Sequence, residues 1–177
     1  MDKEYVKSKV RHLKDWPKPG IIFPDITTLF KDHKALNQVI NDFQSRYQGK
    51  GIEIVVGIDA RGFVLGGSLA FLLGAGFVPA RKKGKLPAEK VEITYDLEYG
   101  TDTLAIHKDA ILPGKKILLI DDVLATGGSA LAAAELISRL QGEIMEIAFV
   151  ISLPAVGGEK RIKEAGYNCY TQIEFIY

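Results

Sequence analysis

Residues 116–129 constrain the fold of this chain more than any other segment. Residues 117–120 are all apolar, which is typical of a short strand buried on both faces of a parallel sheet. Two adjacent carboxylates, Asp121 and Asp122, follow the strand, and a small-residue turn leads into an Ala/Leu-rich stretch at 130–140 that favours a helix. This order predicts an open α/β sheet with a ligand site at the carboxyl end of the strand.

The turn between strand and helix consists of Ala125, Thr126, Gly127, Gly128 and Ser129. Its two glycines let backbone amides approach an anion with no Cβ in the way. The first amides of the helix lack partners, and the helix dipole favours negative charge there. The acidic pair can accept hydrogen bonds from two vicinal hydroxyls, and the turn adds two hydroxyl donors. An acidic pair or a Gly-Gly turn alone is more often structural, but together and in this order they predict a sugar-phosphate site.

Residues 121–129, DDVLATGGS, resemble the phosphoribosyl-pyrophosphate (PRPP) signature of type I phosphoribosyltransferases. Three more segments make the resemblance more specific, pointing to the adenine phosphoribosyltransferases. Residues 19–26, PGIIFPDI, are similar to that family's base-binding segment, and residues 57–63, GIDARGF, to its pyrophosphate loop. Residues 81–87, RKKGKLP, followed by LEYG at 97–100, resemble its catalytic loop.

The resemblance implies a fold, a domain organisation and a reaction. The expected fold is α/β, with a mostly parallel central sheet flanked by helices, a mobile β-loop lid and an N-terminal hood segment. We expect one phosphoribosyltransferase domain over residues 1–177, with the hood at 1–30 and a flexible catalytic loop at 81–108. The implied reaction is purine salvage: the 5-phosphoribosyl group of PRPP passes to adenine, giving AMP and diphosphate. The implied cofactor is Mg²⁺, held mainly through PRPP rather than by direct protein ligands.

Roles for individual residues follow from the same resemblance. Asp121 and Asp122 are expected to bind the ribose hydroxyls, and residues 125–129 the 5′-phosphate. The pyrophosphate loop contributes Asp59, Ala60 and the catalytic Arg61, whose guanidinium can bind phosphate oxygens in pairs. The basic run at 81–85 adds Arg81 and Lys85. In the family, part of this run can reach the site from the partner subunit, so the resemblance implies a homodimer.

Two further groups of residues are expected at the purine. Glu98 is the candidate acid/base at N7 of the ring, beneath a lid that excludes water, and Tyr99 can close over the ligand. Ile22, Phe23 and Pro24 are expected to contact the base, with Leu124 and Ala125 on the opposite wall. Phe23 can stack on the purine. The family more often has a basic residue where Pro24 stands, and proline has no N–H to donate.

Composition is consistent with this interpretation. A length of 177 residues predicts one domain with a sizeable core. The net charge of +1 argues against a generic nucleic-acid or membrane-surface partner. Cys169 is the only cysteine, so no intrachain disulfide is possible. No apolar run reaches the ~20 residues of a membrane helix, and no signal core follows Met1, so we expect a cytoplasmic protein.

Two alternatives stay open. One is the same transfer to another purine: xanthine, hypoxanthine or guanine. The other is a PRPP-sensing regulator that binds nucleic acid, against which the low net charge and the Glu98 segment argue.

The hydrophobic patterns predict the following elements. Helices are expected at 3–14, 32–47, 62–73, 130–140 and 154–165, and an extended loop at 16–25. Strands are expected at 52–58, 77–80, 116–120 and 144–152, with an antiparallel pair at 91–95 and 103–107 and an edge strand at 168–173. Gly66, Gly67 and Ser68 are expected to let their helix pack tightly on the sheet.

Overall fold

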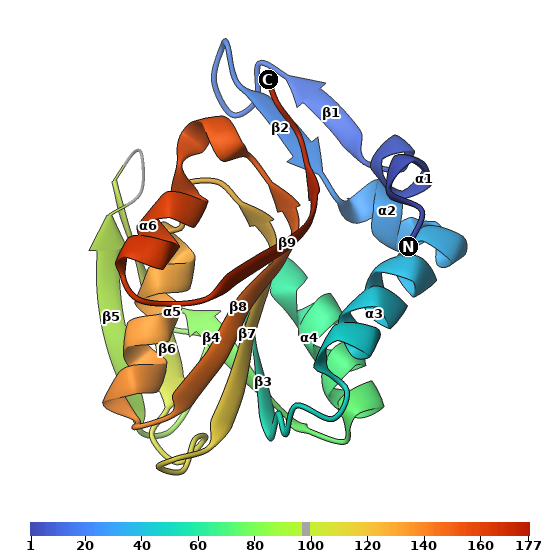
Figure 1. Ribbon diagram of the computed structural model, residues 1–177. Helices are drawn as coiled ribbons and strands as arrows, with labels where there is room; N and C mark the ends of the chain where they lie inside the picture. The colour runs from blue at the N-terminus through green and yellow to red at the C-terminus, as the bar shows by residue number, and fades with distance from the viewer. Residues whose placement is uncertain (97–99) are drawn as a thin grey trace.

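The computed structural model describes residues 1–96 and 100–177, and a seven-stranded sheet forms its centre (Figure 1). The strand order is β5-β6-β4-β3-β7-β8-β9. The five consecutive strands β4-β3-β7-β8-β9 are parallel to one another. Strand β6 pairs antiparallel with both β4 and β5. The predicted α/β fold with a mostly parallel sheet is confirmed.

The elements have the following bounds. The strands of the large sheet are β3 (Ile54–Ile58), β4 (Gly76–Lys82), β5 (Lys90–Asp96), β6 (Thr101–His107), β7 (Lys116–Leu124), β8 (Glu143–Ser152) and β9 (Cys169–Glu174). The helices are α1 (Lys3–Ser8), α2 (Thr27–Lys31), α3 (His33–Tyr47), α4 (Arg61–Leu73), α5 (Gly128–Arg139) and α6 (Gly158–Glu164), with a 3₁₀ turn at Pro154–Val156.

Helices cover both faces of the sheet, as Figure 1 shows. Helices α1 to α4 lie on one face and α5 and α6 on the other. Alternate residues of β7 point to opposite faces: Leu118 and Ile120 pack beneath α3 and α4, whereas Ile117 and Leu119 pack beneath α5. Burial on both faces explains the unbroken apolar run that identified this strand in the sequence.

Two predicted elements are wrong. The helix expected at 3–14 ends at Ser8, and residues Arg11–Lys14 form strand β1, which pairs antiparallel with β2 (Ile22–Asp25) inside the expected loop. A residue-by-residue pattern could not find this pair, because the two strands satisfy each other's backbone groups and bury little apolar surface. Strand β7 also runs past Ile120 to Leu124, so the acidic pair belongs to the strand itself.

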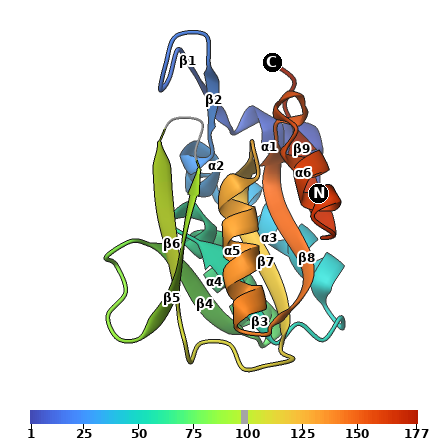
Figure 2. The same ribbon diagram turned by 90° about the vertical axis from the view of Figure 1, so that its left-hand side faces the viewer.

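Strands β1 and β2 form a hairpin, here called the hood hairpin, that stands above the carboxyl edge of the large sheet. Figure 2 shows it at the same edge as the ends of β5 and β6. An isolated two-stranded hairpin is only marginally stable, so its attachment to the core matters for any site beneath it.

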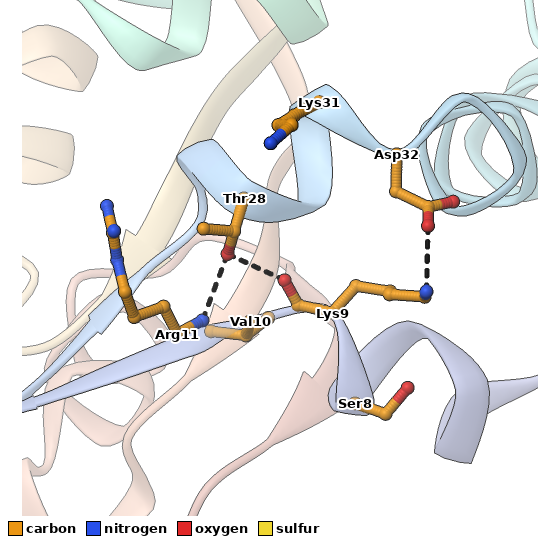
Figure 3. Close-up of a pocket in the computed structure, with 7 residues that line it drawn as sticks. All are labelled: Ser8, Lys9, Val10, Arg11, Thr28, Lys31 and Asp32. Atoms are coloured by element: carbon orange, nitrogen blue, oxygen red, sulfur yellow. Dashed lines mark hydrogen bonds and ion pairs between the residues drawn. The ribbon is translucent and has the colours of Figure 1, made fainter.

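The base of the hood hairpin is attached to α2 by hydrogen bonds (Figure 3). The amide of Arg11 donates to Thr28 Oγ1 over 3.1 Å, and the Thr28 hydroxyl donates to the carbonyl of Lys9 over 2.7 Å. Lys9 Nζ lies 2.8 Å from Asp32 Oδ2. The Arg11 side chain points away from these groups and binds the buried Asp25 at the end of β2.

Helix α4 packs closely on the sheet through Gly66. A Cβ there would lie 2.7 Å from the ring of Phe77, so any larger residue would push the helix away. Nothing lies within 4 Å of the corresponding position at Gly67, so the packing role predicted for that residue is wrong.

Candidate active site

A cavity of about 590 Å³ opens at the carboxyl edge of the sheet, where β3, β4 and β7 end. Most of its lining comes from three segments that are far apart in sequence: the turn after β3, the end of β7 and the hairpin β5–β6. The lining residues are Phe23, Ile58, Asp59, Ala60, Arg61, Lys82, Tyr95, Asp102, Asp121, Asp122, Val123, Ala125 and Ser129. The position agrees with the rule that open α/β sheets bind ligands beyond the carboxyl ends of their strands.

The acidic pair of β7 faces the pyrophosphate loop predicted from the sequence. Arg61 donates from Nε to Oδ2 of Asp122, which is 3% exposed. Burial lowers the pKa of Arg61, but the charge of Asp122 and this hydrogen bond outweigh that effect and raise it. The guanidinium is therefore a permanent positive charge in the cavity wall.

Asp121 is held in a different electrostatic environment. Burial, followed by the negative charge of Asp122, raises its pKa well above that of an ordinary carboxyl group. Its Oδ1 accepts a 2.9 Å hydrogen bond from the amide of Asp122. Gly62 makes the close fit possible, since a Cβ at that position would lie 3.1 Å from Asp121 Oδ1 and 2.9 Å from the carbonyl of Ile120. A strongly perturbed carboxyl in a cleft is typical of functional sites.

The turn between β3 and α4 carries the other predicted pyrophosphate residues. The Asp59–Ala60 peptide is cis, and both residues line the cavity. Asp59 Oδ2 accepts a 2.9 Å hydrogen bond from Arg81 Nε, so the Arg81 side chain supports the turn. The guanidinium carbon of Arg61 lies 5.6 Å from the centre of the Phe23 ring, which links this turn to the hood hairpin.

The basic run at the end of β4 meets the cavity through a different lysine than predicted. Lys82 lines it, and its Nζ lies 3.1 Å from Asp102 Oδ2 on β6. Lys85 is exposed in the turn that follows β4. The sequence held a signal for Lys82, because it precedes the first turn residues and continues the alternation of β4.

The predicted phosphate turn connects β7 to α5 as expected. Gly127 has a φ of 77°, a conformation that glycine adopts without strain, and α5 begins at Gly128. The amide of Gly128 is within 3.5 Å of Thr126 Oγ1, and Arg161 Nη1 donates to the carbonyl of Thr126 over 2.8 Å. Helix α5 has twelve residues and begins between Ala125 and Ser129, which both line the cavity, so the helix end that favours an anion lies at the cavity edge.

A second, mainly apolar cavity of about 330 Å³ adjoins the first on the hood side. The two share Phe23, Val123 and Ala125 as lining residues. The remaining residues of this apolar cavity are Pro17, Ile21, Ile22, Pro24, Leu153, Ala155, Val156, Phe175 and Tyr177. Predicted base-binding residues Ile22, Phe23, Pro24 and Ala125 are therefore brought together here.

Leu124 is not part of this wall. Its side chain is 1% exposed and packs in the core on the α5 side. Val123 lines both cavities in its place. Val123 packs against the cluster beneath α3 and α4, whereas Leu124 belongs to the cluster beneath α5, so strict alternation along β7 is not kept to the end of the strand.

Glu98 and Tyr99, predicted to act on the purine, lie outside the described residues. The described ends of their hairpin reach the cavity: Tyr95 and Asp102 both line it. The carbonyl of Asp96 would lie 3.3 Å from a Cβ at Gly128, so the end of β5 sits against the phosphate turn.

Comparisons with known proteins place the fold and the site in a family. The sequence model of the phosphoribosyl transferase domain matches residues 27–176, which defines the chain as a phosphoribosyl transferase. The adenine phosphoribosyltransferase of Chlorobaculum tepidum is 52% identical over 172 residues, covering 96% of this chain and 97% of that protein. That of Methylobacillus flagellatus is 51% identical over 170 residues, with the same coverage. The chain therefore belongs to the adenine phosphoribosyltransferase family.

Solved structures agree. The crystal structure of adenine phosphoribosyltransferase from Thermoanaerobacter pseudethanolicus superposes with a TM-score of 0.91 at 45% identity, covering 97% of this chain and 99% of that one. The Saccharomyces cerevisiae enzyme, complexed with adenine and an imino-altritol bisphosphate, gives a TM-score of 0.90 at 35% identity, covering 97% of this chain and 98% of that one.

Proposed function

We propose that this protein transfers the 5-phosphoribosyl group of PRPP to adenine, giving AMP and diphosphate. The observation that carries the proposal is the arrangement of two adjoining cavities. One is polar, with the acidic pair, the phosphate turn and Arg61. The other is apolar and shares Phe23 and Val123 with it. A phosphorylated sugar fits the first and a flat, weakly polar base fits the second, with C1′ of the ribose at their junction.

Asp121 and Asp122 hold the two ribose hydroxyls as hydrogen-bond acceptors. The amides and hydroxyls of residues 125–129 bind the 5′-phosphate at the start of α5. Arg61 and Lys82 face the leaving diphosphate, and Arg81 keeps Asp59 and its turn in place. The predicted contribution of Lys85 stays part of the proposal, since a partner subunit can supply it.

The purine lies between Phe23 and Val123. The backbone of Ile22 reads its edge, while Pro24 offers a carbonyl acceptor and no donor. Glu98 remains our prediction for the group that handles the proton at N7, and Tyr99 for closure over the ligand. Such a site favours adenine, whose exocyclic amine donates hydrogen bonds, over 6-oxopurines.

Mg²⁺ fits this site as a companion of the diphosphate. The carboxylates of Asp121 and Asp122 provide hard oxygen donors in the same cavity, and no three metal-binding side chains converge anywhere in residues 1–96 and 100–177. We infer that substrate oxygens and water complete the coordination, with the acidic pair acting through water or hydroxyls. Bound there, the ion would neutralise charge on the diphosphate as it leaves.

The chemistry then needs positioning and charge more than covalent catalysis. As the bond from C1′ to diphosphate breaks, positive charge builds on the ribose ring beside the acidic pair, which stabilises it. Arg61 and Lys82 balance the charge that grows on the leaving group. Phe23 and Val123 keep the base aligned on the opposite face of the sugar, so the new bond forms without diffusion.

The reaction uses phosphorylated metabolites of the cell interior, consistent with the predicted cytoplasmic location. No helix in the described residues is long and apolar enough to span a membrane.

We also propose a homodimer. Helix α4 and the start of β4 expose a group of large apolar side chains: Val64, Phe71, Leu72 and Phe77. Phe71 is 85% exposed. A second copy of the chain is the partner expected from the family resemblance. Phe71→Glu should convert the dimer to a monomer in sedimentation equilibrium, whereas Ile176→Glu, at a comparably exposed residue far from α4, should leave it dimeric.

The direct test is nucleotide formation from PRPP and Mg²⁺ with adenine, hypoxanthine, guanine and xanthine offered separately. AMP from adenine alone is the expected result. Product from a different base would overturn the substrate and keep the PRPP site. Bound PRPP with no product from any base would favour a regulator.

A further inference from the structure

The segment that follows β9 touches the hood hairpin. The hydroxyl of Tyr177 lies 2.5 Å from Nδ1 of His12 on β1. The His12 ring meets Phe175 edge-on at 4.7 Å between ring centres, and Phe175 stacks on Tyr177 at 5.9 Å and 11°. Three rings from opposite ends of the sequence thus form one cluster.

This aromatic cluster, His12, Phe175 and Tyr177, borders the apolar cavity. Phe175 and Tyr177 line that cavity together with Phe23 and Pro24. On the hood hairpin, His12 lies directly opposite Pro24 in the strand register. The contact at Tyr177 therefore reaches the base-binding strand β2 through a single cross-strand neighbour.

The Phe175–Tyr177 segment and the hood hairpin, which form the two sides of the cluster, differ in how firmly they are attached to the large sheet. The amide of Phe175 donates to the carbonyl of Ser152 over 3.0 Å, which continues the pairing of β9 with β8 into the large sheet. The hood hairpin has only two strands. Its hydrogen bond to α2, and the Arg11–Asp25 pair between its own strands, lie at its base. Along β2, Pro24 has no N–H and no polar side-chain atom with which to hold the strand. A side-chain hydrogen bond that holds the hairpin at the level of Pro24 therefore has to come from β1, where His12 lies opposite Pro24.

We propose that Tyr177 and His12 form a latch that holds the hood hairpin over the apolar cavity, and that the Phe175–Tyr177 segment thereby positions β2 for the purine. The inference rests on the proposed function, since it assigns the apolar cavity to the base. Tyr177 is a positioning residue: it acts through His12 and Pro24 and sets the affinity for the base without taking part in the transfer.

The latch makes a selective kinetic prediction. Tyr177→Phe keeps the ring and removes the hydroxyl, so it should raise KM for adenine about 2- to 10-fold, the range of one net hydrogen bond. KM for PRPP and kcat should stay within about twofold, because the polar cavity is built from other elements. His12→Phe should have the same effect, and adding Tyr177→Phe to it should change nothing further. His12→Gln, which can still bond the hydroxyl, should restore most of the affinity.

A matched control is Tyr167→Phe, which removes another tyrosine hydroxyl, one that lies 3.3 Å from Ser138 and outside both cavities. It should leave both KM values unchanged. Equal rises of KM for adenine and PRPP in Tyr177→Phe would show a general loss of structure and overturn the latch, as would no change in either constant.

The fluorescence of Trp16 measures the state of the hood hairpin without depending on catalytic turnover. Trp16 is the only tryptophan of the chain, lies in the hood segment and meets Phe23 edge-on at 4.5 Å. Its fluorescence should become more accessible to acrylamide in Tyr177→Phe and not in Tyr167→Phe; equal quenching in both would overturn the latch. Adenine titration of the same signal should give a weaker Kd in Tyr177→Phe. If acrylamide access increases in Tyr177→Phe alone, but wild type neither binds nor converts adenine, the proposed function fails while the latch stands.

Discussion

Arg61 donates from Nε to the carboxylate of Asp122 and so joins the turn after β3 to the end of β7. The two residues belong to separate sequence motifs, yet an ion pair between Arg61 and the buried Asp122 makes them one wall of the same cavity. Because Asp122 is nearly inaccessible, loss of Arg61 would leave its carboxylate without this hydrogen-bond partner. The pair therefore couples the residues proposed for the ribose to the residue proposed for the diphosphate.

Asp122→Ala should abolish PRPP-dependent AMP formation, with a loss of about 100-fold or more, or about 2.7 kcal/mol, because it removes a carboxylate proposed to bind the ribose and the hydrogen-bond partner that holds Arg61. Initial rates at saturating adenine measure it. Asp109→Ala, at an exposed carboxylate beyond β6, is the matched control and should be fully active. Full activity of the Asp122 variant would contradict the site assignment.

Asp121→Asn should stabilise the fold while it weakens PRPP binding. The pKa of Asp121 is raised in the folded protein, so the folded state binds this proton more tightly than the unfolded state does. Stability is then lost as pH rises past the unfolded pKa, and at neutral pH the ionised carboxylate is a burden that the amide removes. Thermal melts of both proteins at pH 7 test this. A lower melting temperature for the variant would contradict it.

The main features of the sheet edge were predictable from sequence, and the reason is local. The run before Asp121 is apolar because both faces of β7 are buried, and Gly127 is favoured because the turn from strand to helix has a positive φ there. Short-range physics sets each of these features, so pattern analysis can identify them.

The features that pattern analysis missed depend on contacts distant in sequence. The sequence predicts a helix over strand β1, because the pairing of β1 with β2 leaves no hydrophobic period. Val123 lines the cavities because the alternation of side chains is not kept to the end of β7, which the residue types there do not reveal. The contact of His12 with Tyr177 spans nearly the whole chain.

Lys82→Ala should raise KM for PRPP about tenfold, since Lys82 is the lysine of the basic run that lines the polar cavity and a charged contact contributes about 1.5–3 kcal/mol. Its neighbour Lys83 is exposed and outside the cavity lining, so Lys83→Ala is the control. Equal KM values for PRPP in the two variants would show that Lys82 does not meet the diphosphate.

Because of Asp25, we expect the free energy of unfolding to fall at acid pH. Burial opposes its ionisation, but hydrogen bonds from Thr27 and Arg11 outweigh burial and lower its pKa to about 2 from 3.8. A lowered carboxyl pKa contributes stability above about pH 4 that is lost as pH falls towards 2, here about 2 kcal/mol. Urea unfolding at pH 6 and pH 3 should show about half of this loss, because pH 3 is still above the folded pKa of about 2. In Arg11→Ala the difference between the two pH values should shrink, and an unchanged difference would exclude the ion pair as its source.

Gly158→Ala should impair PRPP binding from outside the cavity. A Cβ at this position would overlap the carbonyl of Ala125 and approach Cδ1 of Leu124 to 2.8 Å, so α6 or the phosphate turn must move. The phosphate turn and α6 are also close at Gly127, where a Cβ would already lie 3.2 Å from the Gly158 carbonyl. We expect a destabilisation of about 1–3 kcal/mol, typical of overpacking, together with a higher KM for PRPP and an unchanged KM for adenine. Lys160→Ala, in the same helix but exposed, should change neither constant. A variant that loses stability but keeps its KM for PRPP would show that α6 gives way and that the phosphate turn is held by β7 and α5 alone.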